Sequence, residues 1–279
     1  MLISNILTKK EFLFKGVETM IQLFLPIGIA LYGSQLNLRD GLDFTKWIIV
    51  ITVFCATFLI TTIISQAFGL SKKLSILLAS GLSICGASAI AIVSPLIKAK
   101  KEETSISLIV IMIVGLTAIV FYPFLYHLLG IKTKEFTLIA GTTIPMLGQV
   151  KVTSLQVAGM EGLLEALRYK LIRVSMLLFL IIGITILFIR ERKGPKIPWF
   201  MFFFFGLAIA SNLFEEPFHI RNMLKPWSSF FLSSGLAAIG LTVDFESITA
   251  EGARPLFSVL ISWISVLTGI IIFLRLINV

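Results

Sequence analysis

The chain has 279 residues, of which 57% are hydrophobic and 14% are charged, and its mean hydropathy is +0.99. A soluble domain is typically about 45–50% apolar and about 25% charged, so this composition excludes an ordinary soluble protein. The net charge of +9 does not predict nucleic-acid binding, because Lys and Arg of membrane proteins gather at helix ends beside anionic headgroups. The sequence predicts an all-α, polytopic protein whose first partner is the lipid bilayer.

The apolar residues come in blocks long enough for a helix to cross the ~30 Å hydrocarbon core. The connections between them are short and charged, and none could form a second, soluble domain. Residues 1–279 are therefore expected to form one transmembrane, transporter-like domain, with a core at about 76–160 and flanking helices at 17–70 and 170–277. Nine blocks are predicted, at 17–36, 47–70, 76–97, 104–130, 137–158, 170–190, 197–213, 228–243 and 255–275.

If each block crossed the membrane once, Lys and Arg would divide almost evenly between the two sides, and the positive-inside rule would assign no orientation. One explanation is that some block does not cross simply. The N-terminus lacks the order of a secretory signal peptide, so insertion is expected to depend on the membrane segments themselves. The predicted location is multi-pass in the cell (cytoplasmic or inner) membrane.

Two short self-similarities indicate internal repeats. The first pairs GIALYGSQLNLRD, from Gly28, with GLAAIGLTVDFES, from Gly235. An odd number of predicted crossings separates these copies, so they would have opposite orientations, as in the inverted repeats of secondary transporters. The second pairs Gly81–Ile90 with Gly141–Val150; its identity is thin, and chance likeness between small-residue helices is the alternative.

The segment Ser80–Pro95 replaces bulky apolar residues by Gly, Ala, Ser and Cys. One interpretation is close helix packing, which small side chains permit in lipid. The other is an interrupted helix, because Gly81 and Gly86 lower helix propensity and Pro95 cannot donate a backbone hydrogen bond. An interrupted helix exposes unpaired N–H groups at a half-helix N-terminus, which is a ready anion site. The segment Gly141–Gly159 has the same ingredients, including an internal proline.

The candidate substrate-binding residues come from these two segments. Lys151 is the most telling, because a charge at the centre of a membrane helix costs about 2.5–3.5 kcal/mol on insertion scales and usually has a function. The alternative is that the span ends near Val150 and Lys151 only extends to the interface. The predicted site combines hydroxyls, a thiol, a glycine, an amide and this lysine: Ser83, Cys85, Gly86, Ser88, Thr142, Thr143, Gln149 and Lys151.

The acidic residues sit in connections or at block ends, whereas proton- and sodium-driven carriers usually keep an acid at a span centre. Their positions favour a small anion as substrate, although backbone carbonyls can also hold Na⁺. His127 and His219 lie far apart, and no metal-binding or nucleophile–base spacing is present, so neither an enzyme, a cofactor nor a metal is expected. Lys170 and Arg173 share a helix face, where they could anchor the next span or guide an anion to the site.

One motif carries a family resemblance. SICGASAIAIVSPLIKAKKEE, at Ser83–Glu103, resembles the signature of the YeiH-type family of proposed sulfate exporters. The resemblance implies a fold related to the cation–proton antiporter and anion transporter superfamily, with inverted repeats and crossing discontinuous helices. Ser83–Ser88 and Gly141–Lys151 would then fall in the core. Further matches run along nearly the whole chain: GLSK at Gly69–Lys72, Tyr122-Pro123, Lys170 and Arg173, IPWF at Ile197–Phe200, and AIGLTVDFESI at Ala238–Ile248.

Two features depart from the family pattern. Members usually begin with one or two further hydrophobic segments, whereas the span containing Gly28 lies near the start of this chain. Where the family has an IHDTAQV-like stretch, this chain has IPMLGQV at Ile144–Val150, which lacks the His–Asp pair. If that pair binds substrate or relays protons, this chain has altered specificity or coupling, or has lost transport.

The function expected from the sequence is a secondary transporter of a small anion, such as sulfate or a related organic or inorganic anion, exported by alternating access. A non-transporting membrane assembly protein, or a truncated and degenerate family member, is the alternative. A homodimer is left open.

Overall fold

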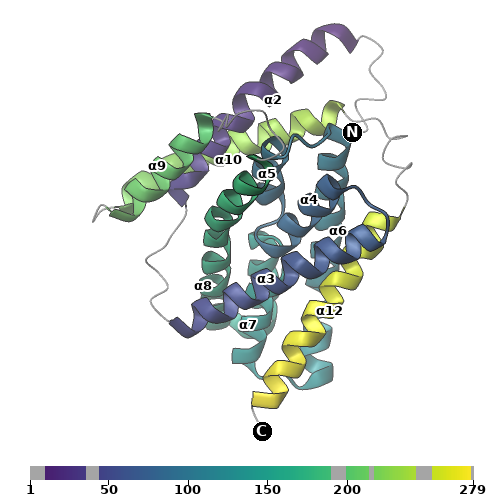
Figure 1. The fold of residues 1–279 in the computed structure, drawn as a ribbon. Helices are drawn as coiled ribbons and strands as arrows, with labels where there is room; N and C mark the ends of the chain where they lie inside the picture. Colours follow the sequence, from purple (N-terminus) through teal and green to yellow (C-terminus); the bar gives the residue numbers. More distant parts are fainter. Residues whose placement is uncertain (1–9, 36–43, 190–198, 214–216, 243–252, 278–279) are drawn as a thin grey trace. The chain divides into compact units, whose positions relative to one another are not determined.

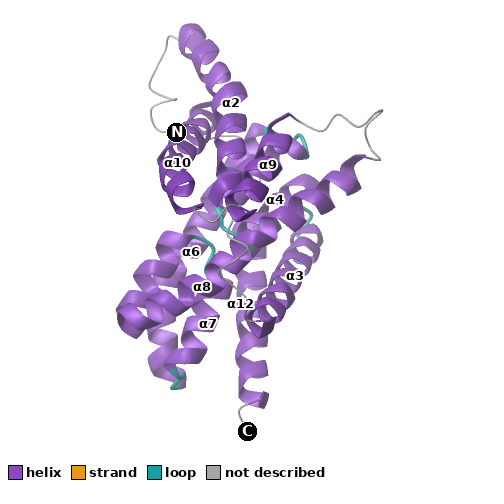
Figure 2. Ribbon diagram, turned by 90° about the vertical axis from the view of Figure 1, so that its left-hand side faces the viewer, coloured by secondary structure: helices purple, strands orange, loops and turns teal. Residues whose placement is uncertain are grey.

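The computed structural model describes residues 10–35, 44–189, 199–213, 217–242 and 253–277. Within these residues every regular element is a helix (Figure 2), which confirms the all-α prediction. The chain divides into two compact units, which are described separately below. In chain order the helices are α2 (Lys10–Tyr32), the 3₁₀ helix η1 (Gly33–Gln35), α3 (Phe44–Ala67), α4 (Lys72–Ser83), α5 (Ala87–Leu96), α6 (Lys101–Leu129), α7 (Thr133–Thr143), α8 (Leu147–Ile189), α9 (Trp199–Leu213), α10 (Pro217–Thr242) and α12 (Arg254–Ile277) (Figure 1).

Four helices of the described residues are long and apolar enough to cross a membrane, namely α3, α6, α8 and α12. The prediction of a multi-pass membrane protein is therefore confirmed. The count of nine spanning segments is not confirmed. Two predicted spans, 76–97 and 137–158, each break midway into two shorter helices, so the prediction of two interrupted helices is confirmed.

Unit 1 comprises residues 1–39, 91–106 and 178–252, and its described part includes α2, α9 and α10. α2 packs against α10 at Gly28, where a Cβ would lie only 2.7 Å from the backbone nitrogen of Leu232. Ser228 of α10 also donates a hydrogen bond to the Gly28 carbonyl at 3.2 Å. Gly28 and Gly235, which begin the two copies of the first self-similarity, therefore lie on helices in direct contact.

Unit 2 comprises residues 40–90, 107–177 and 253–279, and α3 and α12 lie antiparallel on one side of it. The hydroxyls of Ser65, near the end of α3, and Ser258, near the start of α12, are 3.2 Å apart. Toward the other end of this pair, Ile48 and Phe273 line a shared apolar groove. Unit 2 also contains both interruptions, at 84–86 and 144–146, whereas the last part of α5 (91–96) belongs to unit 1.

The first interrupted helix is a hairpin, named here hairpin 1, formed by α4 and α5 with its tip at 84–86. Gly86 has a φ of +71°, and its amide donates to the Gly81 carbonyl at 2.9 Å, which ends α4 in a left-handed glycine turn. A Cβ on Gly81 would lie 2.8 Å from Cδ1 of Ile90, so α5 runs back beside α4. The interruption falls at Gly86, whereas Pro95 lies inside α5 near its end.

The second interrupted helix is hairpin 2, formed by α7 and the first part of α8 (147–158), with its tip at 144–146. Ile144 is extended, with φ −68° and ψ 128°, because the proline that follows it disfavours helical geometry at the preceding residue. α8 then breaks a second time at Gly159, whose φ of 64° and ψ of −163° are not helical.

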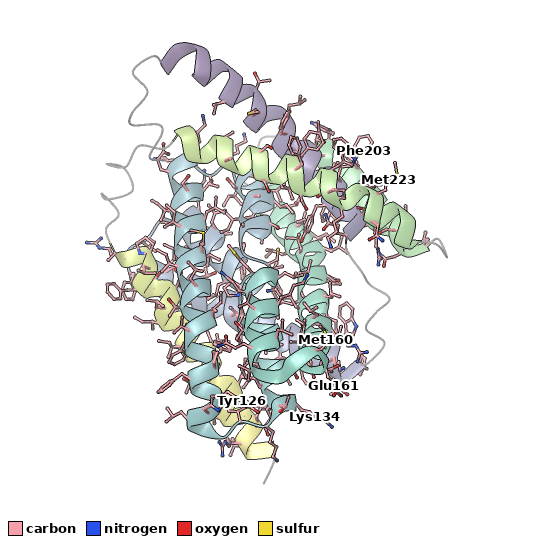
Figure 3. All side chains as sticks on the ribbon, turned by 180° about the vertical axis from the view of Figure 1, so that it is seen from behind. Tyr126, Lys134, Met160, Glu161, Phe203 and Met223 are labelled. Carbon is pink, nitrogen blue, oxygen red and sulfur yellow. The ribbon has the colours of Figure 1, made fainter. Side chains whose placement is uncertain are left out.

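Hairpin 2 returns to the end from which it started. A Cβ on Gly162, just after the second break, would lie 3.4 Å from Cγ2 of Thr137, in the second turn of α7. Figure 3 places Lys134, near the start of α7, and Glu161 at the same end of unit 2. The second part of α8, which begins at 160, then runs alongside α7 in the same direction as far as Tyr169.

The two hairpins point at each other along α6. Ile111, in the first half of α6, would lie 3.5 Å from a Cβ on Gly86 at the tip of hairpin 1. Tyr126, near the end of α6, is 3.4 Å from Thr133 at the open end of hairpin 2, measured between hydroxyl oxygens. Opposed elements of this kind are what an inverted repeat predicts. Both interrupted blocks are thus built from two shorter helices rather than one continuous helix, which agrees with the expectation that some block does not cross simply.

The second self-similarity maps onto equivalent positions of the two hairpins. Gly81 and Gly141 each lie in the last turn before the tip. The residues three positions later, Ile84 and Ile144, are the first to leave the helix. The correspondence in structure favours a repeat over chance likeness for this pair.

Candidate functional site at the hairpin tips

The N-termini of α5 and α8 converge where the tips of the hairpins touch. A Cβ on Gly86 would lie 2.8 Å from Cγ of Met146, and these two residues directly precede α5 and α8. The first amides of each helix have no carbonyl partner within their own helix, and each such end carries about +0.5 of a charge. Ser88 and Leu147 are half-buried and Gly148 is exposed, so this side of the tips is accessible.

The C-termini of α4 and α7 converge on Lys170, which is fully buried. Its Nζ donates to the carbonyl oxygens of Ile84 at 2.8 Å, Ile144 at 2.7 Å and Pro145 at 2.6 Å. Three acceptors at these distances match the three donors of an ammonium group. One side chain thus ties the tip of hairpin 1 to the tip of hairpin 2.

Arg173 makes a second connection between the tips and is only 1% exposed. Its Nε donates to the Ser83 carbonyl at 2.6 Å, one terminal nitrogen donates to Ile144 at 2.9 Å, and the other donates to Leu82. These carbonyls belong to the last turns of α4 and α7, which lack intrahelical donors and carry the negative end of the helix dipole. Lys170 and Arg173 together are named here the cationic brace.

The second part of α8 holds the brace in place through close contact with α7. Lys170 and Arg173 are three residues apart, so both side chains leave α8 on one face. Gly141 of α7 packs tightly against the turn of α8 that precedes Lys170. A Cβ on Gly141 would lie 2.7 Å from Cβ of Tyr169 and would collide with the Ala166 carbonyl. A larger residue at Gly141 would therefore move hairpin 2 away from the brace.

The charges at the tips do not balance. The two helix C-termini contribute about −0.5 each and the two N-termini about +0.5 each, so the helix ends cancel and the two brace charges remain. Among the described residues, neither Lys170 nor Arg173 forms an ion pair, and Glu165 pairs instead with Lys46 and Arg168. Charge buried without a counter-charge is costly, and a bound anion at the accessible N-termini would offset it.

The structure brings most of the predicted site residues to the tips. Cys85 and Gly86 form the tip of hairpin 1, and Ser88 lies in the first turn of α5. Ser83 ends α4, and its buried hydroxyl has no hydrogen-bond partner among the described residues. Gln149 is 7% exposed and lies in the first turn of α8.

The two threonines and the glutamine have structural partners. Thr142 and Thr143 donate to carbonyls one turn earlier in α7, at 2.7 and 2.6 Å. The Thr143 hydroxyl also contacts that of Tyr122, whose ring stacks on Trp263 of α12 with centroids 5.7 Å apart. The Gln149 side chain accepts a hydrogen bond from the Met146 amide at 3.1 Å. These side chains shape the tip of hairpin 2.

Lys151 is not part of this group. Its side chain is exposed on the first part of α8, so it does not supply the buried charge. The interpretation of Lys170 and Arg173 as interfacial anchors is wrong, because both are buried and bind the tips. The sequence signal that could have identified these two residues is a pair of cations, one helical turn apart, at the start of the apolar block at 170–190.

Comparison with known proteins now identifies the family. The family model described as conserved hypothetical protein 698 matches residues 1–259. A UPF0324 membrane protein of Archaeoglobus fulgidus is 36% identical over 249 residues, which cover 88% of this chain and 74% of that protein. This chain belongs to the UPF0324 family of membrane proteins. Another similar UPF0324 protein is the inner membrane protein YeiH of Escherichia coli K12, 32% identical over 270 residues that cover 92% of this chain and 77% of YeiH.

Membership in the UPF0324 family confirms the resemblance to YeiH-type proteins and the predicted location in the cell membrane. No solved structure matches the chain.

Proposed function

We propose that this UPF0324 protein is a secondary transporter that carries a small anion across the membrane, and that it is a carrier rather than an enzyme. The observation that supports this function is the meeting of four half-helix ends beside two buried cations, for which the described residues supply no carboxylate. Discontinuous helices whose N-termini point at an anionic group are a recurrent binding device of transporters.

The anion would bind at the accessible side of the tips. The first-turn amides at 87–89 and 147–149 would donate to it, together with the hydroxyls of Ser88 and Ser83. Lys170 has all three protons bonded to carbonyls, so the brace would act through its positive potential and by holding the tips in register. Sulfate, or an organic or inorganic anion of similar size, would be exported as one helix group moves against another.

The test is flux of a panel of small anions, sulfate first, in proteoliposomes. Ser88→Leu places a bulky side chain at the start of α5 and is expected to lower flux at least about tenfold, which corresponds to about 1.4 kcal/mol. The matched control is Ser265→Leu, because Ser265 is an exposed serine of α12 that bonds only its own helix. Flux equal to that of empty vesicles for every anion would contradict a carrier and favour an assembly role.

A further inference from the structure

Unit 2 has a polar pocket at the open end of hairpin 2, about 820 Å³ in volume. This size lies within the range of roughly 300–1,000 Å³ that is typical of small-ligand sites. The pocket is bounded by the starts of α3 and α7 and by the second part of α8. Figure 3 labels two of its residues, Lys134 and Glu161. Three cations and two carboxylates line it: Lys46, Lys134, Arg168, Glu161 and Glu165.

Glu165 forms ion pairs with two of these three cations, Lys46 and Arg168. One of its carboxylate oxygens accepts from Nζ of Lys46 at 2.5 Å, and the other accepts from a terminal nitrogen of Arg168 at 3.0 Å. Lys46 belongs to α3, so the carboxylate bridges α3 and α8. Lys46 also lies 5.4 Å from the ring centroid of Tyr169. Each Glu165 oxygen therefore accepts a hydrogen bond from one cation. A small oxyanion could bind the same two cations through two of its own oxygens.

The pocket and the cationic brace share a segment of α8. Tyr169 lines the pocket and directly precedes Lys170 in α8. Gly141, three residues before the tip of hairpin 2, packs against Cβ of Tyr169. Tyr169 thus connects the lining of the pocket to the segment of α8 that carries the brace.

We infer that this pocket is an outer site for a small oxyanion and that Glu165 serves as its built-in competitor. A guest with two or more terminal oxygens replaces the Glu165 carboxylate on Lys46 and Arg168, while Lys134 adds a third positive charge. This inference rests on the proposed function for the identity of the bound anion. It adds a second anion site, at the open end of hairpin 2. When the guest leaves, Glu165 closes the bridge between α3 and α8 again.

The test uses the full chain with the substitution Leu164→Cys, because Leu164 lines the pocket and is 56% exposed. Labelling of this cysteine by a negatively charged thiosulfonate reagent is measured against sulfate concentration, with the unsubstituted chain as background. Glu165→Gln, which removes the competitor, is expected to lower the half-protecting sulfate concentration about tenfold. Glu161→Gln is the matched control, since it removes the same charge from the same pocket and Glu161 has no ion pair among the described residues.

Glu161→Gln is expected to change the half-protecting sulfate concentration by less than about threefold, which is the effect of removing one nearby charge in water. Glu165→Asp, which keeps the carboxylate, is expected to behave like the parent chain. Equal effects of Glu165→Gln and Glu161→Gln, or no protection by sulfate in any variant, would overturn the outer site. Protection by anionic lipid in nanodiscs without any effect of sulfate would also overturn it, because the guest would then be a headgroup. Labelling does not require transport, so a failure here is distinguishable from a failure of the flux assay.

Discussion

Lys170 can be replaced by Met with little change in side-chain length, which removes only the charged end of the brace. The substitution leaves three carbonyls, those of Ile84, Ile144 and Pro145, without their donor. A hydrogen bond to a charged group contributes about 1.5–3 kcal/mol, but removing the ammonium also relieves its own desolvation cost. Each buried carbonyl left without a donor costs about 1–3 kcal/mol, and the relieved desolvation offsets part of that sum, so we expect a loss of about 3–5 kcal/mol in the free energy of unfolding.

At roughly 2–4 °C per kcal/mol for a chain of this size, Lys170→Met should lower the melting temperature by about 6–20 °C. Thermal unfolding of the purified protein in detergent, followed by tryptophan fluorescence, measures the change. Lys151→Met is the control, because Lys151 is an exposed lysine of the same helix and should cost less than about 0.5 kcal/mol. Equal melting temperatures for the two variants would refute the view that Lys170 holds the tips together.

Two further predictions concern the geometry of the hairpins. Cysteines introduced at Lys134 and at Glu161 should both react with a membrane-impermeant reagent added from one side and not from the other, because hairpin 2 returns to the end where it began. Reaction from opposite sides would mean that this segment crosses the membrane. Gly86→Ala should destabilise the fold by about 1–3 kcal/mol, because Gly86 has a positive φ and its Cβ would press on Met146. The control is Gly69→Ala, because Gly69 has a similar φ but open space around the new Cβ, and it should cost about 1–2 kcal/mol. Denaturant titration measures both variants, and Gly86→Ala should cost more than Gly69→Ala.

The positions of the helices could be predicted from the sequence, because apolar length and helix breakers are local properties. The predicted block at 104–130 corresponds to α6 at Lys101–Leu129, and the block at 47–70 to α3 at Phe44–Ala67. The two interruptions were also predictable, since glycine and proline weaken a helix whatever surrounds them. The break after Ile144 follows directly from the proline at the next position.

The path of the chain after each break could not be predicted, because it depends on contacts between distant residues. Gly162 meets Thr137 across 25 positions, and nothing in the local pattern distinguishes that return from a straight crossing. The partners of the brace were hidden for a related reason. Lys170 and Arg173 bind backbone carbonyls, which every residue has, so no side-chain motif marks their acceptors. Lys151, which the sequence offered as the charge inside a span, faces outward on its helix.

The binding of an anion at the converging helix N-termini can be tested most directly with selenate, an oxyanion whose selenium scatters anomalously. Crystals of the full chain grown with selenate should give an anomalous peak within hydrogen-bond distance of the first-turn amides at 87–89 or 147–149. That peak should disappear in Ser88→Leu. Anomalous peaks confined to exposed lysines, with none between the tips of the two hairpins, would contradict an anion site there.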